Sequence, residues 1–298
     1  MNAKKFDIAI AYRVYPKVSK RTYVFQYDKF KLVKLCLKSF KKSLGDLKVK
    51  LFVLLDGCPD EYETLFRSLF SEDEIKIYRF DGIGNKATFE KQIDILLNQN
   101  FSDTIYFAED DYFYLPGQFK NLLEFLKGLP GGAFISPYDH PDYYSLLFHR
   151  NKHKVHVIEN RHWRTANSTC LTFLTTKDVL LKTQSVFRTY AHNNFDSSLW
   201  LSLTKNNLYN PVLMVRFLAS EPFYLKSIYK SWLHCWRQIL FGRKWDLWIP
   251  IPTIATHMDE VYLSNGINWK TIIDPEVEKI EAEYKKLSSN LSIGDYLS

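Results

Sequence analysis

Short, continuous apolar segments alternate with amphipathic segments along the first 130 residues. The run 6–12 (FDIAIAY) has no regular polar positions, which is typical of a strand buried on both faces of a parallel sheet. The segment 30–40 instead places apolar residues three and four positions apart, as an amphipathic helix does. The same criteria predict strands at 6–12, 49–58, 75–81 and 104–110, and helices at 30–40, 59–70, 88–97 and 117–128.

This strict alternation of strands and helices predicts an α/β fold, with a mostly parallel sheet flanked by helices on both faces. Further along, the segment 167–180 has the pattern of a strand followed by the start of a helix. Apolar-striped helices are predicted within 191–207 and 220–242. A length of 298 residues corresponds to one large domain, or to one domain with an appended segment.

Composition supports a folded core and limits the class of protein. Hydrophobic residues make up 46% of the chain and aromatic residues 16%, which argues against overall disorder. The cysteines, Cys36, Cys58, Cys170 and Cys235, are too far apart for a zinc knuckle or a CxxC pair, and we expect reduced thiols of a cytoplasmic protein. The first apolar run is too short for a signal peptide, and no apolar run is long enough to predict a membrane-spanning helix.

Positive charge is concentrated near the N-terminus. The formal net charge is +7, and residues 1–50 contain 14 lysines and arginines against 3 acidic residues, a balance of +11. Such a segment favours an anionic partner, which could be a phosphate-bearing ligand, nucleic acid or a membrane surface. The alternative is that these lysines form the solvated face of a helix.

Polar side chains stand at the predicted ends of the four strands, where the ligands of such sheets bind. Those ends carry Tyr12, Arg13, Asp56, Asp81 and the triplet Glu109, Asp110 and Asp111. Three adjacent carboxylates repel one another, and a divalent cation with oxygen ligands relieves that repulsion. Alternatively, the acids lie in an exposed turn and stabilise the next helix through its dipole. Because all four strands end in polar groups, we favour a metal site.

The element order and the segment AEDDYFYLPGQF (108–119) resemble those of GT-A glycosyltransferases, which are Rossmann-like and include the family 2 enzymes. The resemblance covers about residues 6–205. The acidic triplet is similar to the EDD variant of the DxD motif found in enzymes of the N-acetylglucosaminyltransferase I type, and Ala108 stands where a longer motif has its first aspartate. The resemblance implies that Asp111 binds Mn²⁺ or Mg²⁺, whereas Glu109 and Asp110 contact the nucleotide-sugar.

Further nucleotide-sugar contacts are implied by the same resemblance. Tyr12 would stack on the nucleobase, and Arg13 would pair with phosphate. Asp56 would bind the base, while Asn85 and Lys86 would face the nucleotide from the start of the following helix. Two of these residues have simpler explanations, since Asp56 suits a turn and Asn85 could cap a helix.

The remaining parts of the chemistry are expected later in the chain. Asp196 lies in the first turn of the helix predicted in 191–207 and would be the general base of an inverting transfer, although an acid there also suits the helix dipole. The resemblance implies that a late histidine, His257, completes the metal site, although a lone histidine is often a surface or a satisfied residue. Four other histidines have no recognised zinc spacing, and we expect them in a basic loop and strand on the acceptor side: His149, His153, His156 and His162.

The resemblance also divides the chain. Residues 1–219 would form the GT-A catalytic domain, with a nucleotide-sugar half at about 1–130 and an acceptor half at about 131–219. Residues 220–298 would be a C-terminal extension that holds an amphipathic helix and a lid or metal-site segment. The basic, tryptophan-rich stretch 223–248 either packs on the core or makes peripheral contact with the inner face of the cell membrane.

The function expected from these features is transfer of a hexosyl or N-acetylhexosaminyl group from a nucleoside-diphosphate sugar, with UDP-sugar favoured. The acceptor would be a glycan, such as a surface polysaccharide, or a lipid-linked molecule, and nucleic acid is not expected as a partner. One alternative is a non-enzymatic basic protein that binds nucleic acid or anionic membrane, but the chain has no RNA-binding signature. A sugar nucleotidyltransferase ranks lower, because the segment after the first strand has no glycine-rich phosphate loop.

Overall fold

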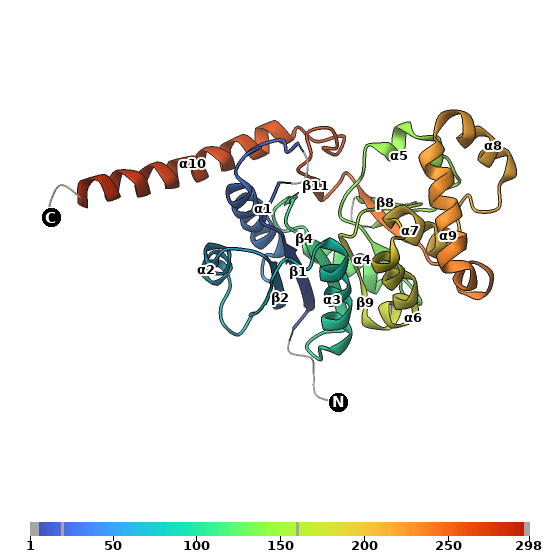
Figure 1. Cartoon of the computed structure of the whole chain (residues 1–298), viewed down its shortest axis with the longest axis horizontal. Coiled ribbons are helices and arrows are strands. Elements are labelled where there is room, and N and C mark those ends of the chain that lie inside the picture. Colours follow the sequence, from blue (N-terminus) through green and yellow to red (C-terminus); the bar gives the residue numbers. More distant parts are fainter. Residues whose placement is uncertain (1–5, 19–20, 159–160, 295–298) are drawn as a thin grey trace.

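A computed structural model describes residues 6–18, 21–158 and 161–294. Its strands are β1 (Ile8–Val14), β2 (Val49–Asp56), β3 (Ile75–Phe80), β4 (Thr104–Glu109), β5 (Tyr112–Tyr114), β6 (Phe134–Ile135), β7 (Val155–Ile158), β8 (Arg161–Ala166), β9 (Phe173–Thr176), β10 (Leu247–Ile251) and β11 (Ala255–His257). Its α-helices are α1 (Lys29–Leu44), α2 (Asp60–Leu69), α3 (Asn85–Asn98), α4 (Phe119–Lys127), α5 (Asp142–Ser145), α6 (Lys177–Phe187), α7 (Asp196–Thr204), α8 (Pro211–Ser220), α9 (Pro222–Phe241) and α10 (Trp269–Gly294). The predicted α/β class is confirmed (Figure 1).

A nine-stranded central sheet, in the order β3-β2-β1-β4-β9-β6-β10-β8-β7, separates two layers of helices. Strands β3, β2, β1 and β4 are parallel, as the alternation of strands and helices predicts, and every residue of β1 and β2 is buried. Helices α1, α2 and α4 pack on one face of the sheet, and α3, α6 and α7 pack on the other. The eight predicted elements of this half are all present, with ends shifted by a few residues.

The second half of the sheet is mixed. Strand β9 runs antiparallel to β4, and β10 lies between β6 and β8. Part of the predicted extension 220–298 contributes to this half, because β10 is a strand of the central sheet. Its sequence LWIPI is short, and Pro250 is a residue that strands usually exclude, which explains why the pattern gave no strand there.

The chain beyond β10 returns to the N-terminal half. Strand β11 pairs antiparallel with β5, in a register that places His257 opposite Tyr112. Helix α10 then runs past α1 and projects from the body of the molecule (Figure 1). Four lysines on α1 form ion pairs with acidic residues of α10: Lys31–Glu281, Lys34–Glu283, Lys38–Glu283 and Lys42–Glu276. For these four lysines the anionic partner is part of the chain itself.

Candidate functional site

Two adjoining cavities mark the candidate site. The first, which we call the strand-end cavity, has a volume of about 340 Å³ and lies at the carboxyl ends of β1, β2 and β4. It is lined by Arg13, Val14, Tyr15, Lys17, Lys29, Asp56, Gly84, Asn85, Thr88, Glu109, Asp110 and Asp111. The prediction that polar strand ends gather at one edge is therefore confirmed for Arg13, Asp56 and the acidic triplet.

Arg13 is held by a buried polar network. Its guanidinium forms an ion pair with Glu109 and donates hydrogen bonds to the backbone carbonyl oxygen of Asn85, at 3.0 Å, and to the Asn85 side chain. The second oxygen of Glu109 accepts a hydrogen bond from Thr172 Oγ1 at 2.7 Å. Burial disfavours the charge of Arg13, but the neighbouring Glu109 carboxylate outweighs this effect and raises the pKa of Arg13. The guanidinium is thus a fixed positive charge at the base of the cavity.

Asp110 connects two segments around the cavity. One of its oxygens accepts a hydrogen bond from Lys29 Nζ at 2.8 Å, and the other accepts one from the backbone N–H of Tyr15 at 2.9 Å. Burial raises the pKa of Asp110, although the Lys29 ammonium group opposes that rise. Asp110 therefore fixes the start of α1 and the loop after β1 against the end of β4.

Asp56 stabilises the turn before α3. Its carboxylate accepts hydrogen bonds from the backbone N–H groups of Ile83 and Gly84, at 2.7 and 2.8 Å. Gly84 has φ of 86°, a conformation that favours glycine. These bonds match the turn interpretation of Asp56, while its side chain still forms part of the cavity wall.

Two predicted nucleotide contacts lie outside the strand-end cavity. The ring of Tyr12 is fully buried between Phe40 and Phe66, so the predicted stacking role is corrected. Side chains alternate along a strand, and position 12 points into the helical layer rather than toward the edge. The ring that lines the cavity is that of Tyr15, which is 43% exposed. Lys86 hydrogen-bonds the Asn193 side chain and lines a separate depression beside Asp196.

Asp111 and His257 meet at the junction of the two cavities. His257 Nε2 lies 3.1 Å from Asp111 Oδ2, because β11 pairs with β5 directly after the acidic triplet. Asp111 lines the strand-end cavity, and His257 lines the second cavity. Within residues 6–18, 21–158 and 161–294, no group of three or more His, Cys, Asp or Glu side chains is arranged around a metal position. A carboxylate and an imidazole nevertheless form a donor set that suits a divalent metal whose other ligands come from a bound phosphate or water.

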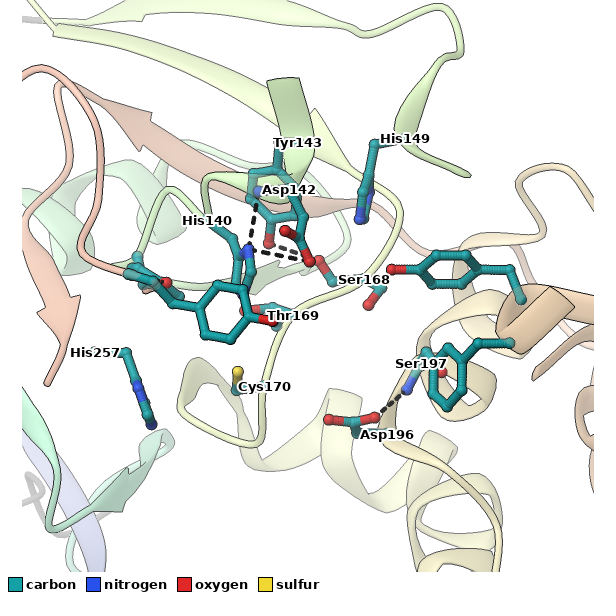
Figure 2. A pocket seen from close by; sticks show the side chains of 14 residues that line it. His140, Asp142, Tyr143, His149, Ser168, Thr169, Cys170, Asp196, Ser197 and His257 are labelled. Atoms are coloured by element: carbon teal, nitrogen blue, oxygen red, sulfur yellow. Dashed lines mark hydrogen bonds and ion pairs between the residues drawn. The ribbon is translucent and has the colours of Figure 1, made fainter. Parts of the chain in front are cut away.

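The second cavity, which we call the aromatic cavity, has a volume of about 470 Å³ (Figure 2). Its lining residues are Tyr138, His140, Asp142, Tyr143, His149, Ser168, Thr169, Cys170, Asp196, Ser197, Phe223, Tyr224, His257 and Tyr262. No lysine or arginine is among these described lining residues, so carboxylates, imidazoles and phenol rings define its chemistry. Asp196 begins α7, and its carboxylate accepts a hydrogen bond from the backbone N–H of Ser197 at 2.7 Å. Figure 2 shows Asp196 and His257 on either side of Cys170.

One histidine of the aromatic cavity, His149, is uncharged. His149 is buried, and burial lowers its pKa to about 3, so its ring is neutral at pH 7. The tip of this ring points into the cavity (Figure 2). Burial, followed by the charge of Glu221, raises the pKa of Asp142. His149 therefore adds no positive charge to the segment 149–163 at pH 7.

The sequence interpretation missed Tyr15, Lys17 and Lys29 in the strand-end cavity and most of the aromatic cavity. One signal was available, because the segment YDHPDYY (138–144) concentrates aromatic, acidic and imidazole groups within seven residues. The lysines carried no comparable signal among the many basic residues of the N-terminal segment.

No protein-family model matches the chain, and no curated protein matches it. Solved structures with some structural similarity to the chain include the glycosyltransferase GlyE of Streptococcus pneumoniae TIGR4. It has 13% identity and a TM-score of 0.43, and the match covers 94% of this chain and 63% of that chain. TarS of S. aureus in complex with UDP-GlcNAc has 11% identity, a TM-score of 0.40, and coverage of 60% and 47%. A 4-diphosphocytidyl-2C-methyl-D-erythritol synthase of Anaerococcus prevotii DSM 20548 has 9% identity, a TM-score of 0.39, and coverage of 67% and 83%. At scores below 0.5 this likeness does not define a family or a function for the chain.

Proposed function

We propose that this protein is a metal-dependent glycosyltransferase of the GT-A type, which transfers a sugar from a nucleoside-diphosphate sugar, with UDP-sugar favoured. The observation that carries the proposal is the contact between Asp111 and His257, 3.1 Å apart, where a cavity lined by three cationic and four acidic side chains adjoins an aromatic cavity without lysine or arginine in its described lining. A glycosyl donor needs this combination, because its diphosphate is anionic whereas sugars are uncharged polyols.

In this proposal the donor nucleotide occupies the strand-end cavity. Lys17, Lys29 and Arg13 supply positive charge for the diphosphate, and the exposed ring of Tyr15 can stack on the base. Glu109 and Asp110 keep two of these cations in place through their ion pairs. Asp111 and His257 would hold Mn²⁺ or Mg²⁺, which would offset the charge of the leaving diphosphate.

The acceptor is assigned to the aromatic cavity. Aromatic faces offer sugars an apolar contact, and the absence of lysine and arginine from the described lining suits an uncharged hydroxylated molecule. Asp196 would take the proton of the acceptor hydroxyl while that oxygen forms its bond to the anomeric carbon. The bond from the anomeric carbon to the diphosphate oxygen breaks, and the diphosphate leaves with the electron pair. Attack from the face opposite the leaving group inverts the configuration, in a hexosyl or N-acetylhexosaminyl transfer.

The domain halves and the location belong to the same proposal. All the residues that line the strand-end cavity lie between 13 and 111, within the donor half at about 1–130. The acceptor half at about 131–219 supplies Tyr138 to Ser197, while Phe223, Tyr224, His257 and Tyr262 add to the cavity from 220–298. We place the enzyme in the cytoplasm, at the inner face of the cell membrane, with a glycan or lipid-linked acceptor. Peripheral contact is proposed through the exposed part of 223–248 only, because Trp245 and Trp248 are buried in the domain.

Donor binding tests the proposal directly, through thermal unfolding of the protein with UDP-sugars and other nucleotide-sugars, with and without Mn²⁺. We expect stabilisation that requires both components, of about 2.7 kcal/mol when the donor is present at about 100 times its Kd. Asp111→Asn should remove the metal-dependent part of the shift. Asp142→Asn makes the same chemical change in the aromatic cavity and should keep it. The proposal is wrong if no nucleotide-sugar stabilises the protein with Mn²⁺ or Mg²⁺, or if Asp111→Asn responds like the wild type.

A further inference from the structure

Helix α9 packs against the domain with small side chains and exposes large ones. Ser227, Ser231 and Cys235 are buried on the side that faces α7. Ser227 Oγ lies 2.8 Å from Ser197 Oγ, and Ser231 Oγ donates a hydrogen bond to the Ser198 carbonyl oxygen at 3.0 Å. Small residues let the two helices approach closely, and only some of the large apolar residues of α9, such as Ile228 and Ile239, are buried.

Those large residues form a stripe on the solvent side of α9. Tyr229, Leu233, Trp236 and Leu240 are spaced four, three and four positions apart, and each is between 46% and 66% exposed. Non-helical backbone at Cys235, with φ of −128° and ψ of 21°, separates Tyr229 and Leu233 from Trp236 and Leu240, so the stripe runs over two helical segments of α9. The predicted apolar stripe is therefore split, because Ile228 and Ile239 face the protein while the stripe above faces water.

Helix α8 adds further apolar surface at the same end of the molecule. Val212, Val215 and Leu218 are each at least 63% exposed. Helices α8 and α9 lie side by side at the end remote from the tip of α10 (Figure 1). Of the twenty large apolar side chains that are exposed in the described part of the chain, ten lie within residues 209–241. An apolar surface so concentrated marks an interaction site.

The charges around this surface are positive. Between residues 211 and 244 the chain has six lysines and arginines and one acidic residue, Glu221. The Glu221 carboxylate accepts hydrogen bonds from the backbone N–H groups of Leu147 and Phe148, so it is directed into the protein. Lys226 and Arg237 are exposed on α9, near the stripe residues Tyr229 and Trp236 in the sequence. Neither forms an ion pair with an acidic side chain that the structure describes. The lysines of α1 differ, because α10 supplies their acidic partners.

We propose that the outer surface of α8 and α9 docks on the anionic surface of a lipid bilayer. An apolar stripe that contains tryptophan and is flanked by lysine and arginine is the pattern of a helix lying in a membrane interface. Each basic residue near an anionic leaflet adds to the attraction. A second copy of the chain is a poorer fit, because a two-fold contact through this surface would bring its own cations together. Among the described residues, none of the helices combines the length and the apolar sequence that spanning a bilayer requires.

Docking would place the aromatic cavity near the membrane. Phe223 and Tyr224, in the first turn of α9, line that cavity. If the proposed transfer is correct, this position suits an acceptor whose sugar is attached to a lipid. The docking itself follows from the surface of α8 and α9 and does not depend on the transfer.

Co-sedimentation of the full chain with vesicles tests the docking. We expect binding to phosphatidylcholine vesicles that contain phosphatidylglycerol, at least about tenfold weaker binding to pure phosphatidylcholine, and loss of binding at high salt. The double variant Trp236→Gln/Leu240→Gln should weaken binding at least about tenfold. The pair Lys226→Glu/Arg237→Glu should abolish the preference for the anionic lipid. Val155→Ser/Val157→Ser changes two exposed apolar residues of β7 and should leave binding unchanged.

Three results would overturn the docking proposal. These are no binding of the wild type to anionic vesicles, equal binding to both vesicle types, and binding that the α9 variants do not affect. If the protein is a dimer in solution and Trp236→Gln/Leu240→Gln makes it monomeric, the surface of α8 and α9 binds a second copy of the chain and not a membrane. Nucleotide-sugar binding in the absence of vesicles is measured separately, so failure of the docking and failure of the transferase proposal are distinguishable.

Discussion

The two cavities of the candidate site differ in how they are built and in how they are charged. The strand-end cavity is formed by the ends of neighbouring parallel strands, and two of its cations are paired with carboxylates, Arg13 with Glu109 and Lys29 with Asp110. The aromatic cavity is formed by loops and helix ends from residues 138 to 262, and its described lining has carboxylates without lysine or arginine. Under the proposed function this difference corresponds to two ligands, an anionic donor and an uncharged acceptor, on either side of Asp111 and His257.

The largest expected effect separates the two cavities by function. Asp196→Asn removes the proposed base from the aromatic cavity and should lower the rate of sugar transfer by about 10²- to 10⁴-fold, the range for general base catalysis. Donor affinity should stay at the wild-type value, because Asp196 does not line the strand-end cavity. Single-turnover rates and calorimetric donor titration measure the two quantities independently.

Asp142→Asn is the matched control for Asp196→Asn, since it makes the same change in the same cavity. It should reduce transfer far less, because Asp142 lines the cavity but is not the proposed base. If Asp142→Asn abolishes transfer and Asp196→Asn does not, the base is Asp142. If Asp196→Asn instead loses donor affinity, the division between the two cavities is wrong.

The second effect concerns stability at acid pH and involves the aromatic cavity. His149 has a folded-state pKa of about 3, whereas an unfolded histidine has a pKa of about 6.5. Below about pH 6.5 the unfolded chain therefore binds a proton that the folded chain does not, and the stability present above that pH is progressively lost toward pH 3. Between about pH 7 and pH 5, His149 should lower the free energy of unfolding by about 2 kcal/mol.

Urea denaturation of His149→Gln at the two pH values checks this assignment. The variant should lose about 2 kcal/mol less than the wild type over the same pH change, whatever its stability at pH 7. His156→Gln is the control, because His156 is an exposed residue of β7 and its replacement should preserve the wild-type dependence. An unchanged pH dependence in His149→Gln would mean that His149 is charged or solvated in the folded protein.

The same contrast explains how far the sequence could predict the site. Parallel strands end at one edge of a sheet, so the order of elements was enough to bring Arg13, Asp56 and Asp111 together. Which tyrosine lines the cavity was harder to predict, because Tyr12 faces the core whereas Tyr15 faces the cavity. The aromatic cavity depends on packing between distant segments, such as Tyr138 with Tyr262, whose relative position no local pattern encodes.

Helix α9 shows the same limit of a periodic pattern. Helical spacing predicted an apolar stripe between 220 and 242, and the helix is present. Which side faces the domain was decided by Ser227 and Ser231, whose small size permits close approach to α7. Periodicity marks large apolar residues and gives no weight to serines, so the packed side was not predictable from it.

The smallest expected effect tests whether the ring of Tyr15 stacks on the nucleobase in the strand-end cavity. Tyr15 is 43% exposed at that cavity, and stacking of a base on its ring should be worth about 1 kcal/mol, the lower end of measured base–aromatic contacts. Tyr15→Ala should therefore weaken UDP binding about fivefold. Tyr27→Ala makes the same change at a ring that is 98% exposed and outside the cavity lining, and it should leave UDP affinity unchanged. Calorimetric titration with UDP and Mn²⁺ measures both, and equal affinities for the two variants would place the base away from Tyr15. A larger loss of UDP affinity in Tyr15→Ala than in an alanine variant of any aromatic-cavity ring would support binding of the nucleotide in the strand-end cavity.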